Sequence, residues 1–311
     1  MQIEIRSYKP EYISQMIDVQ TEYQKKYPNY AIRGEEVYTN HPGFENRQNI
    51  LCAFNSEGKL LAYAPLLPAP VKAESSQEHQ HYIWTDMIYN PKVEELETVE
   101  NELFNRMIKR ANEIKATFPE RATRLASAKY SDEEEGIRYF LAKGFELYES
   151  LYVMKRDLSK PIPELPKPEH ICVKKWKIES DIDKDNYVRV DNLSNPNSPI
   201  TLEKLDWFLN NLWKVGTPIG AFNESDELVG NVMTFWFSSE DAVTEEIFVL
   251  PEYRGKGIAQ YMVKEALCYL RECGKTKAEL EVRKSNTNAV NLYKKLGYEI
   301  DKVECSLGIY L

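Results

Sequence analysis

The sequence predicts an α/β (α+β) protein in which one fold, a mixed sheet flanked by helices, occurs twice. Strand-like and helix-like patterns recur in the same order in both halves. A proline-rich segment, residues 158–170, separates the halves and suits an extended linker. The segment Arg138–Glu149 resembles Asn291–Lys302, since both end a helix at glycine and enter a strand through an aromatic residue. We therefore expect domains at residues 1–157 and 171–311.

The first half begins with an alternating pattern, typical of a strand, followed by an amphipathic helix. A long loop is expected at Lys25–Asn49, which is polar and rich in aromatic residues; it either forms part of the wall of an acceptor cleft or is a plain surface loop. The expected strands lie at 2–8, 49–55, 59–67, 81–90, 121–129 and 145–157, and the expected helices at 11–24, 95–114 and 133–144.

The second half repeats this order after the linker. Its central helix starts at a glycine-rich turn and is ended by Gly274, while Gly297 closes its last helix. The expected strands lie at 171–177, 217–223, 227–237, 242–250 and 277–283, the expected helices at Asp181–Leu193, Leu202–Trp213, Gly257–Cys273 and 287–297, and the last strands within 298–311.

Composition excludes several classes of protein. The chain has 311 residues, 42% of them hydrophobic, and a net charge of −9, which argues against nucleic acid or an anionic membrane as a partner. No apolar run approaches the ~20 residues of a membrane-spanning helix, and the N-terminus does not resemble a signal peptide. Five cysteines without a CxxC pair favour reduced thiols, and the four histidines are scattered. We expect a cytoplasmic monomer or homodimer without a metal site.

The turn Arg254–Ala259 (RGKGIA) lies between an apolar strand and a helix. Gly255 and Gly257 let the backbone approach an anion closely, and the helix N-terminus offers free N–H groups. Arg254 and Lys256 add positive charge. The turn lacks the spacing of a P-loop, and Gln260 stands where a dinucleotide fingerprint needs a small residue. It therefore predicts a pyrophosphate site of another kind.

Two motifs in the second half are similar to those of a known family. The pattern R-x-x-G-x-A, with Arg254, Gly257 and Ala259, resembles the acyl-CoA-binding signature of the GNAT (GCN5-related) N-acetyltransferases. The segment Leu280–Glu299 has that family's N-x-x-A-x-x-L-Y-x-x-L-G-[FY] pattern and also resembles the ribosomal-protein alanine N-acetyltransferases. The resemblance implies two tandem GNAT folds, each with a mixed, mostly antiparallel sheet.

The resemblance also implies roles for individual residues, with acetyl-CoA as co-substrate and no metal. The strand end would bind the pantetheine arm and acetyl group through Ile247, Phe248 and Val249, with the Val249 N–H near the thioester carbonyl. Asn286 would contact the CoA arm, and Tyr293 would protonate the leaving thiolate. The pyrophosphate would be held by the backbone amides of Arg254, Gly255, Lys256, Gly257, Ile258 and Ala259.

Amine acetylation also needs a base to take the amine proton. Glu281 matches the glutamate that serves as base in the ribosomal-protein alanine N-acetyltransferases, and Glu245 and Glu246 are the alternatives. Plainer interpretations stay open: Glu281 pairs with Arg283 on a solvated face, Asn286 is a helix N-cap, and Tyr293 is a core aromatic residue.

The first half lacks the residues that carry this chemistry. Aligning the two halves places Phe140 opposite Tyr293, and a phenyl ring cannot donate a proton. The positions of Arg254, Gly255 and Gly257 are occupied by Glu94, Glu95 and Glu97. Carboxylates there repel a pyrophosphate. We expect a degenerate GNAT-like domain without catalysis or bound acetyl-CoA.

The sequence thus predicts an acetyl-CoA-dependent N-acetyltransferase. It would transfer acetyl directly to a primary amine of a small molecule or of a protein or peptide N-terminus. The alternative is a non-catalytic acyl-CoA-binding or regulatory protein, which would not require an acid and a base.

Overall fold

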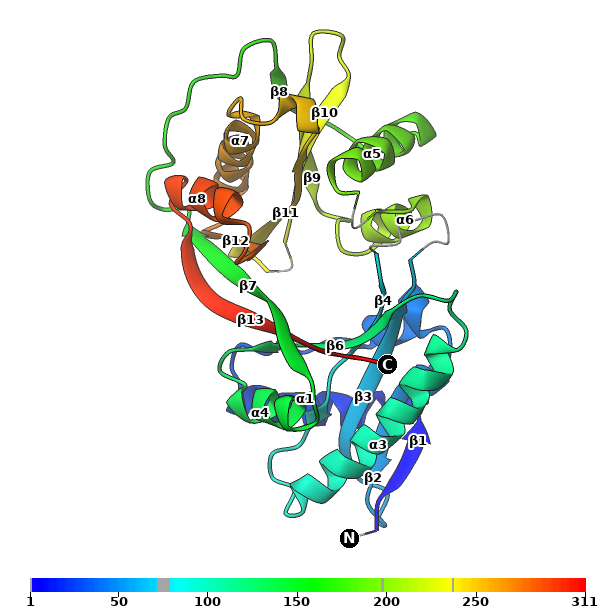
Figure 1. The fold of residues 1–311 in the computed structure, drawn as a ribbon. Coiled ribbons are helices and arrows are strands. Elements are labelled where there is room, and N and C mark those ends of the chain that lie inside the picture. Colours follow the sequence, from blue (N-terminus) through cyan, green and yellow to red (C-terminus); the bar gives the residue numbers. More distant parts are fainter. Residues whose placement is uncertain (1, 72–78, 197–198, 237) are drawn as a thin grey trace. The chain divides into compact units, whose positions relative to one another are not determined.

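The computed structural model describes residues 2–71, 79–196, 199–236 and 238–311 and divides the chain into two compact units. Unit 1 comprises Met1–Ser150 and Glu304–Leu311, and unit 2 comprises Leu151–Val303 (Figure 1). Each unit has its own hydrophobic core. Among the described residues, no helix combines the length and the apolar character needed to cross a bilayer.

The sheet of unit 1 is antiparallel except for one parallel pair, β4 with β6. Helices α1 and α3 both pack on β3. The strands are β1 (Glu4–Ser7), β2 (Ile50–Phe54), β3 (Leu60–Ala69), β4 (His81–Thr85), β5 (Ile88–Tyr89) and β6 (Thr123–Tyr130). The helices are α1 (Ile13–Lys26), α2 (Glu35–Asn40), α3 (Leu96–Lys115) and α4 (Glu134–Ala142).

Two expectations for unit 1 are wrong in detail. The segment Lys25–Asn49 is not a plain loop, because it contains α2 and buries Tyr30 and Tyr38. The Tyr38 and Tyr63 hydroxyl oxygens are 2.9 Å apart, so this segment is held against β3. The single strand expected at 81–90 is interrupted at Asp86, whose carboxylate turns to an ion pair, and forms β4 and β5.

The sheet of unit 2 has the order β7-β12-β11-β10-β9-β8, and only β11 and β12 are parallel (Figure 1). Helix α7 packs on β9, β10 and β11, while α5 packs on β10 and β11. The strands are β7 (Glu146–Asp157), β8 (Cys172–Lys175), β9 (Thr217–Phe222), β10 (Leu228–Phe235), β11 (Asp241–Val249), β12 (Lys277–Arg283) and β13 (Glu299–Tyr310). The helices are α5 (Asp181–Ser194), α6 (Leu202–Asn210), α7 (Ile258–Glu272) and α8 (Thr287–Lys295).

Local sequence explains most helix boundaries in unit 2. Ser180 begins α5 with a capping box in which its side chain and that of Asp183 bond each other's backbone N–H. Helix α6 ends earlier than expected. In the turn that follows, the backbone N–H of Trp213 donates to the Phe208 carbonyl at 2.8 Å. The strand expected at 227–237 ends at Phe235, and its last expected residue lies outside the described residues. The last strands expected within 298–311 form one strand, β13.

Two strands complete a sheet formed mainly by the other half of the sequence. In unit 2, Leu151–Asp157 of β7 pair antiparallel with β12. In unit 1, Glu304–Tyr310 of β13 pair antiparallel with β6. Strand pairing therefore groups the chain differently from the domain ranges 1–157 and 171–311, which follow the order of the sequence. The expected α/β class, with a mixed sheet and flanking helices in each half, is confirmed.

Candidate active site

The parallel strands β11 and β12 separate before either of them ends. They pair only from Asp241 opposite Lys277 to Val243 opposite Glu279, although β11 continues to Val249. Against β10, the register of β11 shifts by one residue between Glu245 and Phe248, which indicates a β-bulge. Glu246 has a φ of 46° there. Beyond Val243, the edge of β11 that faces β12 is therefore open.

The backbone of Val249 points to this open edge. Val249 lies opposite Gly230 of β10, and the next residue, Leu250, donates its N–H to the Val229 carbonyl at 2.9 Å. In an antiparallel ladder this pattern makes Val249 and Gly230 a non-hydrogen-bonded pair. The N–H and C=O of Val249 consequently point away from β10, so this N–H is available to an acceptor in the gap between β11 and β12.

The glycine-rich turn follows this strand end and opens α7. Gly255 and Gly257 have φ angles of 75° and 76°, a left-handed conformation that glycine adopts without strain. A Cβ added at either glycine would meet no atom within 4 Å, so the turn has open space beside it. The first turn of α7 also has backbone N–H groups without intrahelical acceptors. The turn therefore has the backbone geometry of an anion site.

Arg254 contributes less to this anion site than the sequence suggests. Its guanidinium donates to the Val249 carbonyl at 2.9 Å and to the Ser194 carbonyl at 2.8 Å, which ties the turn to β11 and α5. Its backbone N–H donates to Pro251 at 3.2 Å. The amide donors left for an anion thus begin at Gly255.

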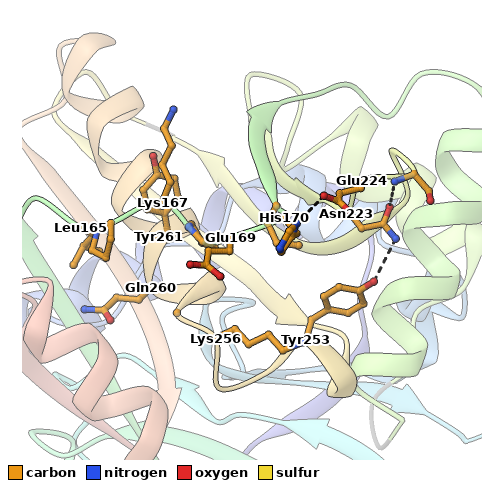
Figure 2. A pocket seen from close by; sticks show the side chains of 15 residues that line it. Leu165, Lys167, Glu169, His170, Asn223, Glu224, Tyr253, Lys256, Gln260 and Tyr261 are labelled. Carbon is orange, nitrogen blue, oxygen red and sulfur yellow. Dashed lines mark hydrogen bonds and ion pairs between the residues drawn. The ribbon is translucent and has the colours of Figure 1, made fainter.

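A cavity of about 760 Å³ adjoins the turn in unit 2. Figure 2 shows linker residues from Leu165 to His170 along one wall, with Tyr253 and Lys256 below them. The Lys256 ammonium lies 5.2 Å from the centre of the Tyr253 ring, and the Tyr253 hydroxyl accepts a hydrogen bond from Asn223 at 3.3 Å. The cavity thus combines a cation with an aromatic wall, and the linker forms part of it.

Asn286 and Tyr293 lie at the start and near the end of α8. The Asn286 side chain accepts the Ala289 N–H at 3.2 Å, so Asn286 is the N-cap of α8, while its side chain remains exposed to a ligand. Tyr293 is buried, and its ring meets that of Tyr298 edge-on at 5.9 Å. Burial alone raises the pKa of Tyr293 to about 12, so its hydroxyl keeps its proton at neutral pH.

The candidate bases lie on both sides of the gap. Burial raises the pKa of Glu245 and of Glu246 to about 7. The nearby charge of Glu246 adds to the rise at Glu245, and the nearby charge of Asp191 adds to the rise at Glu246. Glu281 on β12 is exposed to solvent, but surrounding protein atoms and the Glu279 charge still raise its pKa. A carboxylate in an open cleft has this combination of access and desolvation. The pKa values of Glu245 and Glu246 suit a general base near neutral pH.

The corresponding region of unit 1 is closed. Strand β4 pairs with β6 along its whole length, from His81 opposite Thr123 to Thr85 opposite Ser127. Beyond it, Lys129 is buried, with its ammonium 2.5 Å from Asp86, 3.1 Å from Glu133 and 2.8 Å from the Tyr23 hydroxyl.

The aligned residues of unit 1 also differ from those of unit 2. Phe140 is buried in α4, and Glu133 precedes that helix as Asn286 precedes α8. The side chains of Glu94, Glu95 and Glu97 are exposed at the start of α3. Unit 1 therefore has neither an open strand edge nor a glycine turn at this place.

Sequence reasoning missed three residues beside the candidate bases. Trp213 donates its indole N–H to Glu245 at 2.5 Å, and Tyr187 and Asp191 of α5 lie near Glu246. Tyr187 and Asp191 are spaced by four residues, which places them on one face of a helix, but this spacing equally suits a core stripe. Only the packing of α5 on β11 brings them to the site.

Comparison with solved structures gives the class of fold. A GCN5-related N-acetyltransferase from Sphaerobacter thermophilus aligns with a TM-score of 0.76 and 17% identity, covering 99% of this chain and 95% of that one. A tandem GNAT protein from the clavulanic acid biosynthesis pathway aligns with a TM-score of 0.72 and 14% identity, covering 99% and 98%. The chain therefore has a tandem GNAT fold.

Sequence comparison finds similarity within unit 2. Residues 187–298 match the Acetyltransferase (GNAT) family. An uncharacterised N-acetyltransferase of Methanocaldococcus jannaschii is 38% identical over 88 residues, which are 28% of this chain and 37% of that protein. A Bacillus subtilis protein assigned as a ribosomal protein bS18-alanine N-acetyltransferase is 33% identical over 76 residues, 24% of this chain and 50% of that protein. The chain thus spans half or less of the length of either relative.

Proposed function

We propose that unit 2 is an acetyl-CoA-dependent N-acetyltransferase that transfers acetyl directly to a primary amine. The observation that carries this proposal is the open edge of β11, where the Val249 N–H points into a gap that leads to the turn at Gly255–Ala259. An N–H at this position can stabilise the oxyanion that forms when an amine attacks a thioester. The GNAT-family match over residues 187–298 supports the same chemistry.

The residues present fit CoA at both ends of the gap. The amides from Gly255 to Ala259 and the N-terminus of α7 would hold the pyrophosphate, and Ile247, Phe248 and Val249 would bind the pantetheine arm. The exposed Asn286 amide would contact that arm. The cavity beside Lys256 and Tyr253 has the charge and the aromatic surface for the nucleotide end. Bound acetyl-CoA supplies the thioester carbon that the amine attacks.

The acid and base roles follow from the protonation states of the side chains. Glu281 or Glu246 would take the proton from the amine nitrogen as its lone pair forms the C–N bond. The C–S bond then breaks, and Tyr293 would donate its proton to the thiolate. Exchange with solvent returns a proton to Tyr293 and removes one from the glutamate. The products are an acetylated amine and free CoA.

The acceptor would be a small amine or a peptide N-terminus. The name of the Bacillus subtilis relative refers to an alanine of a ribosomal protein, which supports a protein acceptor for this chain. The rows of aromatic and acidic side chains beside β11 suit the first class equally, and the charge pattern is developed below.

The test is thiol release from acetyl-CoA with a panel of amines and peptides. The wild type should release CoA with at least one acceptor, and Tyr293→Phe should lower kcat by at least about tenfold while leaving CoA affinity unchanged. Tyr269→Phe is a matched control, because it removes the hydroxyl of a half-buried tyrosine, bonded to Thr217 at 2.8 Å, near the other end of α7. Undiminished turnover in Tyr293→Phe would exclude the acid role. CoA binding without release for any acceptor would favour a non-catalytic acyl-CoA-binding protein.

A further inference from the structure

Four carboxylates in unit 2 form a row that leads from the gap between the strands to α5. The charge of Glu245 on β11 interacts with that of Glu281 on β12 and with that of its neighbour Glu246. The charge of Glu246 interacts in turn with that of Asp191 on α5. Mutual repulsion adds to burial in raising the pKa of Glu245 and of Glu246. One base is enough for acetyl transfer, so three of these four groups have no role in that step.

Positive charge from the protein does not balance this row. Glu245 accepts a hydrogen bond from the neutral Trp213 indole at 2.5 Å, and Asp191 accepts one from the neutral Asn195 amide at 2.9 Å. In the part of the chain that the structure describes, none of the four forms an ion pair with a lysine, arginine or histidine. The charge of Lys204 of α6 acts on three of them, but Lys204 is exposed and its ammonium lies over the Phe208 ring at 5.4 Å.

A buried hydroxyl beside the row also lacks a partner. Tyr187 of α5 is fully buried, and its hydroxyl oxygen makes no hydrogen bond within the described structure. Burial raises the pKa of this hydroxyl, and the charges of Glu246, Asp191 and Glu245 add to that rise, so all three carboxylates are in its neighbourhood. An unsatisfied buried hydroxyl costs free energy unless a further group bonds it.

Aromatic rings enclose the same place. The Tyr187 ring is 6.2 Å from that of Trp213 and 5.5 Å from that of Phe248, and Phe208 stacks on Trp213 at 4.6 Å. Aromatic faces combined with carboxylates are the surroundings that alkylammonium groups prefer. Glu245 and Glu246 are half-buried and so can be reached from the gap, while Asp191 and Tyr187 form the buried end.

We propose that this row binds a linear acceptor with at least two positive charges, a diamine or polyamine. Its reacting amine would lie between Glu281 and the Glu245–Glu246 pair, beside Val249. Its second ammonium would lie toward Asp191 and Tyr187, where it donates to carboxylate and hydroxyl oxygens and supplies the missing positive charge. This assignment rests on the proposed acetyl transfer only for the role of the first amine.

The test measures binding to the full chain without acetyl-CoA, so that it does not depend on catalysis. Isothermal titration at pH 8 compares 1,4-diaminobutane with butylamine, which has the same carbon chain and one charge. The diamine should bind at least about tenfold more tightly, because one additional desolvated charge pair is commonly worth that much. Its affinity should fall as pH drops below about 7, where Glu245 and Glu246 become protonated.

Variants locate the second charge. Asp191→Asn should remove most of the advantage of the diamine and leave butylamine binding unchanged, and Tyr187→Phe should weaken the diamine with the fold intact. Asp185→Asn changes an exposed carboxylate on the same helix and should alter neither affinity. The other charged groups around the row, Lys204, Lys302 and Glu279, are kept in all variants.

The outcomes separate this proposal from the proposed function. Equal affinity for the two amines would overturn the proposed site for the second ammonium. An equal loss of affinity for both amines in Asp191→Asn would also overturn it. The same holds if calcium chloride alone binds as tightly as the diamine. Tight diamine binding without CoA release would uphold the cation site and reject acetyl transfer. Acetyl transfer to monoamines and diamines at the same kcat/KM would reject the cation site alone.

Discussion

Replacing Glu246 by glutamine should make unit 2 more stable, and the stability gain should depend on pH. Glu246 is half-buried at the bulge of β11, and burial with the nearby Asp191 charge raises its pKa from 4.5 to about 7. A carboxyl with a raised pKa in the folded state stabilises the fold when protonated. This contribution is complete below pH 4.5 and is lost as pH rises through 7.

The size of the effect follows from the two pKa values. The difference between 4.5 and about 7 corresponds to roughly 3 kcal/mol in the free energy of unfolding, at about 1.4 kcal/mol for each pH unit. This is an upper bound, because an ionised side chain that is partly accessible can turn toward water. At pH 8, Glu246→Gln should therefore raise the melting temperature of unit 2 by several degrees. At pH 4.5 it should change nothing.

Urea denaturation of the wild type and Glu246→Gln at pH 4.5, 6 and 8 measures this difference. Glu252→Gln is the control, since Glu252 is exposed in the turn after β11 and should give no gain at any pH. CoA release by the same samples should fall if Glu246 is the base. A gain of equal size at all three pH values would refute the electrostatic reasoning, because a neutral packing effect does not titrate.

Three further predictions concern other parts of the molecule. Gly257→Ala should cost roughly 1 kcal/mol of stability, because a φ of 76° at this position strains alanine. The same substitution should weaken CoA binding measured by calorimetry. Unchanged CoA affinity would exclude the turn as the pyrophosphate site. Lys129→Met should destabilise unit 1 by roughly 3–5 kcal/mol in urea unfolding, because Asp86 and Glu133 lose their buried cation, and a loss below 1 kcal/mol would contradict this. Deleting residues 304–311 should lower the melting temperature and promote aggregation seen by light scattering, because β6 loses its antiparallel partner, whereas a soluble variant of unchanged stability would show that β13 is dispensable.

Sequence patterns predicted most elements of the fold, because hydrophobic periodicity and capping residues are local signals. Helix α8, for example, begins at its Asn286 cap and ends before Gly297, as its sequence indicates. The extent of pairing between β11 and β12 was not predictable, because it depends on the bulge at Glu246. The pairing of β7 with β12 and of β13 with β6 was also not predictable, because the patterns of β7 and β13 identify strands but carry no information about their partners.

The candidate site was predictable only where a family motif covers it. The turn, Asn286 and Tyr293 belong to such motifs; the turn follows β11, and the helix that Asn286 caps and Tyr293 lies on follows β12. The Arg254 side chain was assigned to phosphate on its charge, yet its guanidinium bonds two backbone carbonyls. Asp191, Tyr187 and Trp213 come from elements far apart in the sequence, and no local pattern distinguishes them from ordinary core residues.

The reciprocal use of β7 and β13 has a consequence for how the protein is made. During synthesis the sheet of unit 1 stays incomplete until residues 304–310, its final strand, have emerged. Residues Leu151–Asp157 likewise stay without their β12 partner until that strand, which lies far downstream in the sequence, has been synthesised. Such distant pairing slows folding and leaves strand edges exposed in the nascent chain. The two halves therefore mature together rather than one after the other, and a ribosome-stalled chain lacking β13 should bind chaperones that the released protein does not.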